Sequence, residues 1–574
     1  MRITNKIMQN NNLSNINTNK IYQDKLSTQM STQKKINRPS DDPVIAIRAL
    51  RLRSSVTEVT QYYSKNIPDA ESWLDVTEGA LKTLSDIVTR MITLCNKGAN
   101  GTWTTEDRQI TLDELKALGE QVYATGDADY AGRYVFTGYR TDTSLSFQAE
   151  ETKPYEITEQ LKNSVIDSVT KVNTGKLPDL NSANFKDPDM KDIIEDDISA
   201  VEVHRIRLSY DDLTAGGNVQ ISFPVKKQAE NPDGTLKFET NADGSQKLDE
   251  NGQPIPVYEV GADGKIVYEM KTWSGAAGDI ETMHSYDKKT VTRDDGTTVE
   301  LDAYNYVAEK GNEDKIVFVP ETGELLLGEN RYQELMSLKD DETTLADESQ
   351  IQVTYEKNHW QKGDLRPEHY FYCKSNPGDA EKEIVYNETY LSVDAERQDI
   401  EYDVGYNQTI RVNSTADQCF KHGIGREVDD LVNTIQDVLN LEALHTSLSK
   451  MLDGMADGAE GKDTLQKQVD AVKKALTLAK DKEQKMLEGG ISAFQGHLDD
   501  TTLCLTECGT RSSKLELIKN RSQNQKTTFE TLKSENEDID ITEVAIYLTS
   551  AELTYEAALM ATGKVSQTTL LNFI

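Results

Sequence analysis

The sequence predicts an α+β fold built from nested, discontinuous domains. Apolar residues recur at helical seven-residue spacing towards both ends of the chain, whereas turn dipeptides and short β-prone runs fill the middle. A chain of 574 residues is also too long for one ordinary core. We expect terminal coiled-coil helices over 1–42 and 538–574, an inner bundle of long helices with short β elements over 43–147 and 405–537, and a β-rich outer insertion over 148–404 with room for two subdomains.

The N-terminal segment is polar and carries few apolar positions, of which Ile3 and Ile7 are the first. A turn cluster then separates it from the next helix. This turn motif consists of Arg38, Pro39, Ser40, Asp41, Asp42 and Pro43. We expect Ser40 or Asp41 to cap the following helix and Pro43 to occupy its first turn.

A long helical pattern follows, to about residue 96. Pro68 lies inside it and should start a new helix or kink the old one. The apolar stripe of its second part is Ile67, Ala70, Leu74, Thr77, Leu81, Leu84, Val88, Met91 and Cys95. A further helix should begin at Thr104 or Thr105 and run to about Tyr130, with Ile110 among its apolar positions, before a short strand at 134–136.

The pattern in the middle of the chain predicts strands and hairpins. Turn dipeptides occur at Asp233-Gly234, Asp243-Gly244, Asn251-Gly252, Asp263-Gly264 and Asp295-Gly296. Strand candidates are 219–225, 255–260, 265–270, 315–319, 351–355, 370–373, 401–404 and 408–412. Helices return over 426–452, 464–488 and 491–532, and Gly489-Gly490 is expected to separate the last two.

The C-terminal helix carries the clearest candidate functional feature, a stripe that keeps alternating steps of three and four. This assembly seam comprises Ile541, Val544, Leu548, Ala551, Tyr555, Ala558, Thr562, Val565 and Thr569. Such a stripe needs a partner helix, and the N-terminal segment of the same chain or of neighbouring copies is the natural candidate. We therefore expect Ile3 and Ile7 to belong to the assembly seam as well. Because Ala and Thr interrupt the larger apolar residues, the seam should be weak until neighbours complete it.

Composition excludes several classes of protein. The formal net charge is −35, from 63 basic and 98 acidic residues, which argues against nucleic acid as a partner. No apolar run is long enough for a membrane span, and the first 20 residues show no cleavable signal peptide. Five cysteines do not make a disulfide framework. Cys504 and Cys508 could hold part of a metal site, but small residues in a helix seam are the favoured interpretation.

The sequence shows no constellation typical of catalysis. The seven histidines form no zinc-helix motif, and nucleophile-elbow and phosphate-loop motifs are missing. Glu368 and His369 are adjacent, but neighbouring residues of a strand point to opposite faces, so a surface loop or edge is favoured over a catalytic pair. We therefore expect no catalytic, cofactor or metal site, and a protein that is not an enzyme.

Six short motifs give the chain a family resemblance. They are 1–5 (MRITN), 35–43 (KINRPSDDP), 77–81 (TEGAL), 132–138 (GRYVFTG), 540–545 (DITEVA) and 570–574 (LLNFI). Together, in this order, they resemble flagellins and, more closely, the hook-associated protein 3 family, the second of two junction proteins between flagellar hook and filament. The resemblance covers about 1–147 and 405–574 and leaves the middle unassigned.

This resemblance implies a structural protein whose termini are disordered before assembly and pair as a coiled coil lining a channel. Its implied partners are further copies of itself, the first hook-associated junction protein, flagellin and an export chaperone. It also implies an extracellular location in the flagellum, reached through the flagellar secretion apparatus without a cleaved signal. Three alternatives stay open: a filament-forming flagellin with a divergent middle, an enzyme displayed on a filament scaffold, and an insertion that binds glycans or host surfaces. Exposed Tyr residues and Trp273 or Trp360 are the candidates for the last of these, although partly buried strand residues are the favoured interpretation of both tryptophans.

Overall fold

The computed structural model describes residues 5–567, except 102, 189, 217, 232, 234, 242, 244, 249–251, 262–265, 294–297, 338–350, 380, 393–396 and 457. The chain divides into two compact units. Unit 1 comprises Met1–Ser72, Glu401–Val412 and Thr510–Ile574, and unit 2 comprises Trp73–Ile400 and Asn413–Gly509. Helices and sheets both contribute, which confirms the predicted α+β class.

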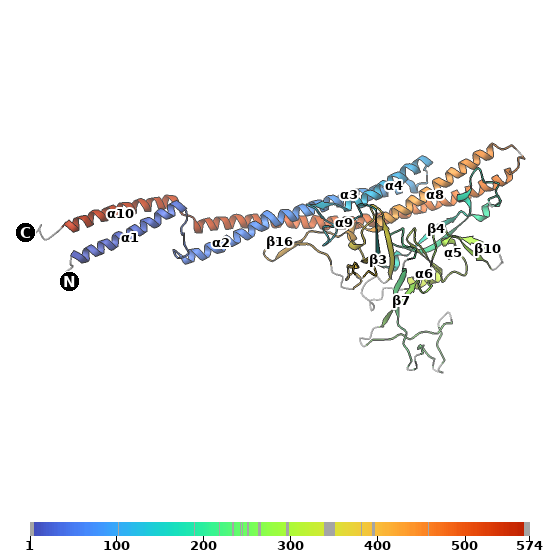
Figure 1. The fold of residues 1–574 in the computed structure, drawn as a ribbon, viewed down its shortest axis with the longest axis horizontal. Helices are drawn as coiled ribbons and strands as arrows, with labels where there is room; N and C mark the ends of the chain where they lie inside the picture. The colour runs from blue at the N-terminus through green and yellow to red at the C-terminus, as the bar shows by residue number, and fades with distance from the viewer. Residues whose placement is uncertain are drawn as a thin grey trace, which may run out of the picture. The chain divides into compact units, whose positions relative to one another are not determined.

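Unit 1 is mainly helical. Its elements are α1 (Asn5–Thr32), α2 (Pro43–Gln61), a π-helical turn (Tyr62–Asn66), the start of α3 (Ile67–Ala99), the end of α9 (Lys462–Glu537), α10 (Ile541–Gln567), and the hairpin of β16 (Glu401–Gly405) and β17 (Gln408–Arg411). Helices α1 and α10 lie side by side (Figure 1). The predicted terminal helix and the predicted final strand pair are thus confirmed.

The helix cap after the turn motif differs from the expected one. Asp42 caps α2, because its Oδ1 accepts hydrogen bonds from the backbone N–H groups of Val44 (2.9 Å) and Ile45 (3.1 Å). Ser40 and Asp41 lie too early to reach these donors. Pro43 occupies the first turn as predicted.

Pro68 lies where the helix changes its winding. The π-helical turn Tyr62–Asn66 immediately precedes α3, and the N–H of Ile67 bonds to the carbonyl of Tyr62. Proline has no N–H for the ordinary helical ladder, and an inserted residue is one way to accommodate that loss. The expected discontinuity is therefore present as a local π bulge.

The helices of unit 2 bury the predicted stripe of α3. From Leu74 to Cys95 every stripe position is essentially inaccessible to solvent. Thr104 is the N-cap of helix α4 (Thr105–Gly126). Its hydroxyl accepts a hydrogen bond from the Asp107 N–H, while the Asp107 carboxylate accepts one from the Thr104 N–H. The expectation for Ile110 was wrong, since its side chain is 65% exposed.

Helix α9 runs unbroken through Gly489 and Gly490, so the predicted break is wrong. Two glycines weaken a helix by about 1 kcal/mol each, yet tertiary packing overrides that preference. A Cβ on Gly490 would lie 3.4 Å from Cys95 Sγ and from Leu431 Cδ1, so Gly490 faces these two side chains in the packed interior. Helix α8 (His422–Asp453) matches the prediction closely.

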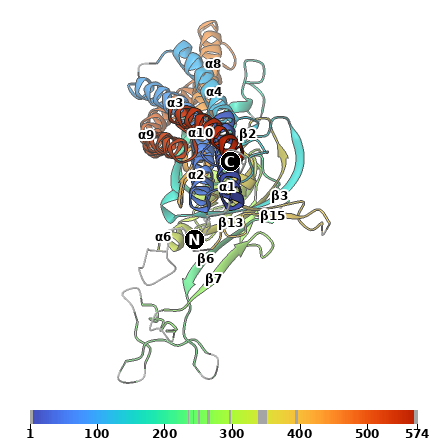
Figure 2. The same ribbon diagram turned by 90° about the vertical axis from the view of Figure 1, so that its left-hand side faces the viewer.

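Two sheets form the β-rich part of unit 2. One has six antiparallel strands in the order β15-β14-β3-β13-β6-β7, and several of them are seen together in Figure 2. The other has the order β4-β5-β12-β11-β8, in which only β11 and β8 are parallel. Their strands are β3 (Glu151–Leu161), β4 (Asp167–Asn173), β5 (Ser199–Arg207), β6 (Gln220–Lys226), β7 (Tyr268–Ser274), β8 (Ile280–Thr282), β11 (Ile316–Val319), β12 (Glu324–Leu327), β13 (Ile351–Trp360), β14 (Tyr372–Ser375) and β15 (Ile384–Tyr386).

Shorter elements complete the unit. They are β1 (Asp129–Tyr130), β2 (Arg133–Tyr134), β9 (Lys289–Thr292), β10 (Thr298–Leu301), α5 (Ala303–Ala308), α6 (Glu329–Met336) and α7 (Ala416–Cys419). The predicted strands at 219–225, 315–319, 351–355 and 370–373 correspond to β6, β11, β13 and β14, whereas β3, β4 and β5 were missed. The expected hairpin around Asp263-Gly264 appears as an isolated Val260–Ile266 bridge, and its tip lies outside the described residues.

Candidate assembly seam

The inward stripe of α10 faces α1 at most of its predicted positions. Val544 and Ala551 are buried, and Leu548 packs against them together with Leu26, Met30 and Ile539. The later stripe residues Tyr555, Ala558 and Thr562 are half-buried. Ile541 is 50% exposed at the helix start. Val565 lies in the helix but its side chain is not described, and Thr569 is outside the described residues.

The facing stripe of α1 is largely polar. Its buried or half-buried positions are Asn12, Ile16, Asn19, Gln23, Leu26 and Met30, which alternate steps of four and three. The prediction counted apolar residues only and so missed the polar half of this repeat, which its spacing could have revealed. Ile7 is 50% exposed rather than in the stripe, and Ile3 lies outside the described residues.

Backbone hydrogen bonds join the end of α1 to the segment between α9 and α10. The N–H of Lys35 donates to the carbonyl of Glu537 (2.7 Å), and the N–H of Ile539 donates to the carbonyl of Gln33 (3.2 Å). Lys34 Nζ pairs with the Asp538 carboxylate beside them. The seam is therefore fixed most firmly where its two helices meet this joint.

Glu537 is the acidic residue of the joint that pairs with two basic side chains. Its role could not be predicted from the sequence, in which it is one of several acidic residues in a short stretch. Its side chain is only 3% exposed. Arg53 holds it in a fork, with Nε and Nη2 at 2.6 and 2.8 Å from its two carboxylate oxygens, and Lys34 Nζ is 3.7 Å away. The hydrogen bond from Arg53 holds the pKa of Glu537 below its usual value, although burial opposes this.

The turn motif shapes the chain between α1 and α2. Asp41 Oδ2 accepts from the backbone N–H groups of Arg38 (2.9 Å) and Asn37 (3.1 Å), and these bonds lower the pKa of Asp41. Arg38, Pro39 and Ser40 are exposed. The motif thus acts as a self-bonded turn and contributes no side chain to the seam.

Unit 1 also has apolar positions that point away from the seam. On α10 they are Ile546, Leu553 and Met560, each more than 60% exposed and seven residues apart. We call these three residues the outer stripe. Further exposed apolar residues are Leu13 and Ile21 on α1 and Val44, Ile47 and Leu50 on α2. Exposed apolar residues repeated along a helix are typical of an interaction surface.

The described part of the chain contains no group of three or more His, Cys, Asp or Glu placed to hold a metal ion. All five cysteines are buried thiols, and burial raises the pKa of Cys95 to about 12. Cys508 Sγ donates to the Leu74 carbonyl at 3.6 Å, as a helix-packing residue would. Trp273 and Trp360 are both buried, which agrees with the favoured interpretation and leaves neither side chain exposed to bind a glycan.

The described helices include none that is both long and apolar enough to cross a membrane.

The N-terminal part of the chain is similar to known flagellar proteins. Residues 3–141 match the bacterial flagellin N-terminal helical region. Flagellar hook-associated protein 3 of Salmonella typhimurium is 30% identical over 156 residues, which are 26% of this chain and 47% of that protein. Its Escherichia coli counterpart is 28% identical over 166 residues, covering 29% and 52%. A flagellin of Clostridium tyrobutyricum is 33% identical over 122 residues, covering 21% and 32%.

Residues 3–141 of the chain are therefore similar to a flagellin-type N-terminal helical region. The chain is also similar to flagellar hook-associated protein 3, and it spans about half the length of the two relatives of that name. A solved hook-associated protein-3 structure from Legionella pneumophila is 12% identical, with a TM-score of 0.25 over 84% of this chain and 98% of that one.

Proposed function

We propose that this protein is a structural, non-catalytic component of the bacterial flagellum that forms the junction layer between hook and filament and so serves motility. The similarity of its N-terminal region to flagellins and hook-associated proteins supports the flagellar role. The observation that carries the assembly mechanism is the α1–α10 pair, which has a small internal seam and an apolar outer stripe.

Assembly through this pair is coupled folding and association. The α1–α10 seam fully buries few apolar residues, among them Leu26, Val544 and Ala551, and so gains little from pairing within one chain. Neighbouring copies that cover the outer stripe add the missing burial and order both helices. Contacts between non-identical patches then give a helical or ring-like layer, depending on whether they close.

The proposed partners are further copies of this chain, the first hook-associated junction protein below the layer and flagellin above it. An export chaperone is the proposed partner before secretion. The proposed location is extracellular, reached through the flagellar secretion apparatus. No catalytic step is part of this function.

A second candidate function is a filament-forming flagellin with a divergent middle. The 33% identity to a clostridial flagellin favours it. The two functions differ in copy number, because a junction layer holds few copies per flagellum and a filament protein holds thousands. Quantitative mass spectrometry of purified flagella separates them.

The test replaces the outer stripe without touching the seam. The double variant Leu553→Asp, Met560→Asp should be secreted in normal amounts but should not support filament growth, because charged side chains oppose burial at the contact. The matched control is Glu552→Gln together with Glu556→Gln on the same helix, which should assemble normally. Deleting residues 541–574 should likewise leave a soluble product that does not assemble. Normal filaments built on the double variant would contradict the proposal.

A further inference from the structure

The solvent-facing side of α4 carries a repeat that the assembly seam does not use. Ile110 is 65% exposed, and exposed residues on both sides of it advance by steps of four and three. They are Glu106, Ile110, Asp113, Ala117 and Glu120. Residues at this spacing share one face of a helix. We call these five residues the acidic face of α4, because three carboxylates flank two apolar side chains.

A second exposed face, on α2 in unit 1, has the opposite charge. Its apolar residues Val44, Ile47 and Leu50 are 68%, 54% and 62% exposed. Arg48 and Arg51 are exposed beside them. We call these five residues the basic face of α2. Val44, Ile47 and Arg51 again advance by three and four, so this face too can pack along another helix.

The charged side chains of both faces have no oppositely charged partner in the described part of the chain. No described carboxylate contacts the guanidinium of Arg48 or Arg51, whereas Arg53 on the same helix is held by Glu537 at 2.6 Å. The three carboxylates of the acidic face contact no described lysine, arginine or histidine. In a chain of net charge −35, two unpaired arginines among exposed apolar residues fit a negatively charged protein surface.

We propose that the basic face of α2 in one copy docks on the acidic face of α4 in a neighbouring copy, a contact that rests on the assembly role proposed above. The apolar residues of the two faces pack at the centre, and the arginines pair with the carboxylates at the rim. A second copy is the occupant because every copy carries a face of matching charge and spacing. The contact joins non-identical patches, so it repeats from copy to copy, separately from the contact that covers the outer stripe of α10.

This contact is weak by itself. Two faces of five residues each bury less than the about 1,200 Å² at which specific stable interfaces begin. Copies of net charge −35 also repel one another in dilute solution. The two faces therefore meet when the polymer already holds the copies side by side, and their charges then fix which patches meet.

Cysteine cross-linking in assembled flagella tests the contact. Copies with Ile47→Cys and copies with Ile110→Cys are expressed together, and the purified flagella are mildly oxidised. We expect a disulfide-linked dimer on a non-reducing gel from the mixed copies and none from either variant alone. The five native cysteines are buried thiols and give little background. The matched control pairs Ile110→Cys with Thr528→Cys, an exposed position on α9, and should give no dimer.

Three cross-linking results would overturn the proposal: no dimer from the mixed copies, a dimer from one variant alone, or an equal yield when Thr528→Cys replaces Ile47→Cys. These results concern only the contact, because the chain is then present in the flagella. Absence of the parent chain from purified flagella would instead refute the proposed function, and this contact with it.

Charge reversal tests the pairing of the two faces. The double variant Arg48→Glu, Arg51→Glu should lower incorporation into flagella by about tenfold or more, because like charges then face each other. The double variant Glu106→Arg, Asp113→Arg should do the same.

Combining all four changes in one chain should restore incorporation, because the pairs form again with opposite signs. Rescue also shows that the double variants fold, since added charges would not repair a misfolded helix. Normal incorporation of either double variant, or no rescue by the fourfold variant, would overturn the proposed pairing.

Discussion

The helices of unit 2 and the α1–α10 pair of unit 1 both follow a seven-residue repeat, but they bury very different surfaces. Along α3, the stripe from Leu74 to Cys95 is inaccessible to solvent and packs in a core with large residues such as Trp73. Among the described side chains of the α1–α10 pair, only Leu26, Val544 and Ala551 are fully buried apolar residues. The same sequence periodicity therefore gives a stable core in one place and an incomplete seam in the other.

This difference follows from the residues at the stripe positions. Fixing the backbones of helices of 28 and 27 residues carries a large entropy cost. Burial of the polar residues Asn12, Asn19 and Gln23 on α1 offsets little of this entropy cost. We infer that unit 2 folds by itself, whereas α1 and α10 become ordered when neighbouring copies cover their outer faces.

The largest effect is expected from breaking a buried ion pair of unit 2. Arg108 and Glu483 are each about 5% exposed, and Nη2 lies 2.8 Å from Oε2. Glu483→Leu leaves the guanidinium buried with the Glu442 carboxylate and the Trp103 carbonyl as its remaining partners, and should lower the free energy of unfolding by about 3–4 kcal/mol in urea titration. Glu537→Gln in unit 1 should leave this transition unchanged, because its partner Arg53 is 55% exposed. Equal losses in both variants would contradict the contrast between the units.

A matched pair of leucines sharpens the same comparison. Leu84→Ala should lower the free energy of unfolding of unit 2 by about 3 kcal/mol, because it removes a fully buried side chain and leaves a cavity. Leu26→Ala on α1 should not move that transition in the monomer, although it should impair assembly. Chemical unfolding monitored by circular dichroism measures the first effect and filament complementation the second. A monomer destabilised equally by both changes would refute the distinction.

A smaller effect should appear as a pH dependence of unit 2. Burial raises the pKa of Asp429 to about 6, although Arg426 lies 3.7 Å away and favours the ionised form. The other charged groups acting on it are Asp211, Asp430 and Arg207. Because the folded-state pKa lies above the unfolded value, ionisation of Asp429 reduces stability as pH rises from about 4 through 6.

The Asp429→Asn variant has no carboxyl group at this position, so it does not lose stability through this ionisation as pH rises. Because the Asp429 side chain is 51% exposed, solvent screening weakens this effect. The difference in unfolding free energy between variant and parent should therefore shift in favour of the variant by about 1 kcal/mol or less between pH 4 and pH 8. Urea titrations at both pH values measure it, with the exposed Asp142→Asn as a control that shows no such shift. A difference that stays constant with pH would show that Asp429 does not titrate in this way.

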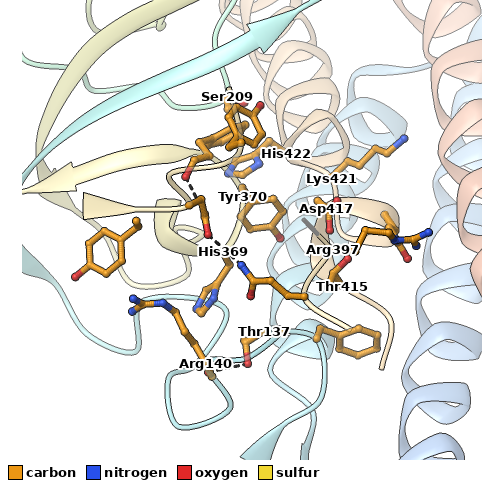
Figure 3. Close-up of a pocket in the computed structure, with 18 of the residues that line it drawn as sticks. Thr137, Arg140, Ser209, His369, Tyr370, Arg397, Thr415, Asp417, Lys421 and His422 are labelled. Atoms are coloured by element: carbon orange, nitrogen blue, oxygen red, sulfur yellow. Dashed lines mark hydrogen bonds between the residues drawn. The ribbon is translucent and has the colours of Figure 1, made fainter. Parts of the chain in front are cut away.

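The sequence predicted features that depend on repeated local patterns. The stripe of α3, the stripe of α10 and several strands such as β6 and β13 follow directly from residue spacing. Features set by tertiary packing were missed: α9 continues through Gly490, which faces Cys95 and Leu431 in the packed interior. A cavity of about 850 Å³ beside Arg140 (Figure 3) also combines segments far apart in the sequence, so no local pattern could reveal it.

Hydrogen exchange of the monomer, compared with the assembled layer, tests the central claim most directly. We predict that the amides from Val544 to Tyr555 on α10 exchange rapidly in the monomer and slowly after assembly, while those from Leu84 to Met91 on α3 are protected in both states. Strong protection of the α10 amides in the isolated monomer, equal to that of α3, would contradict the account.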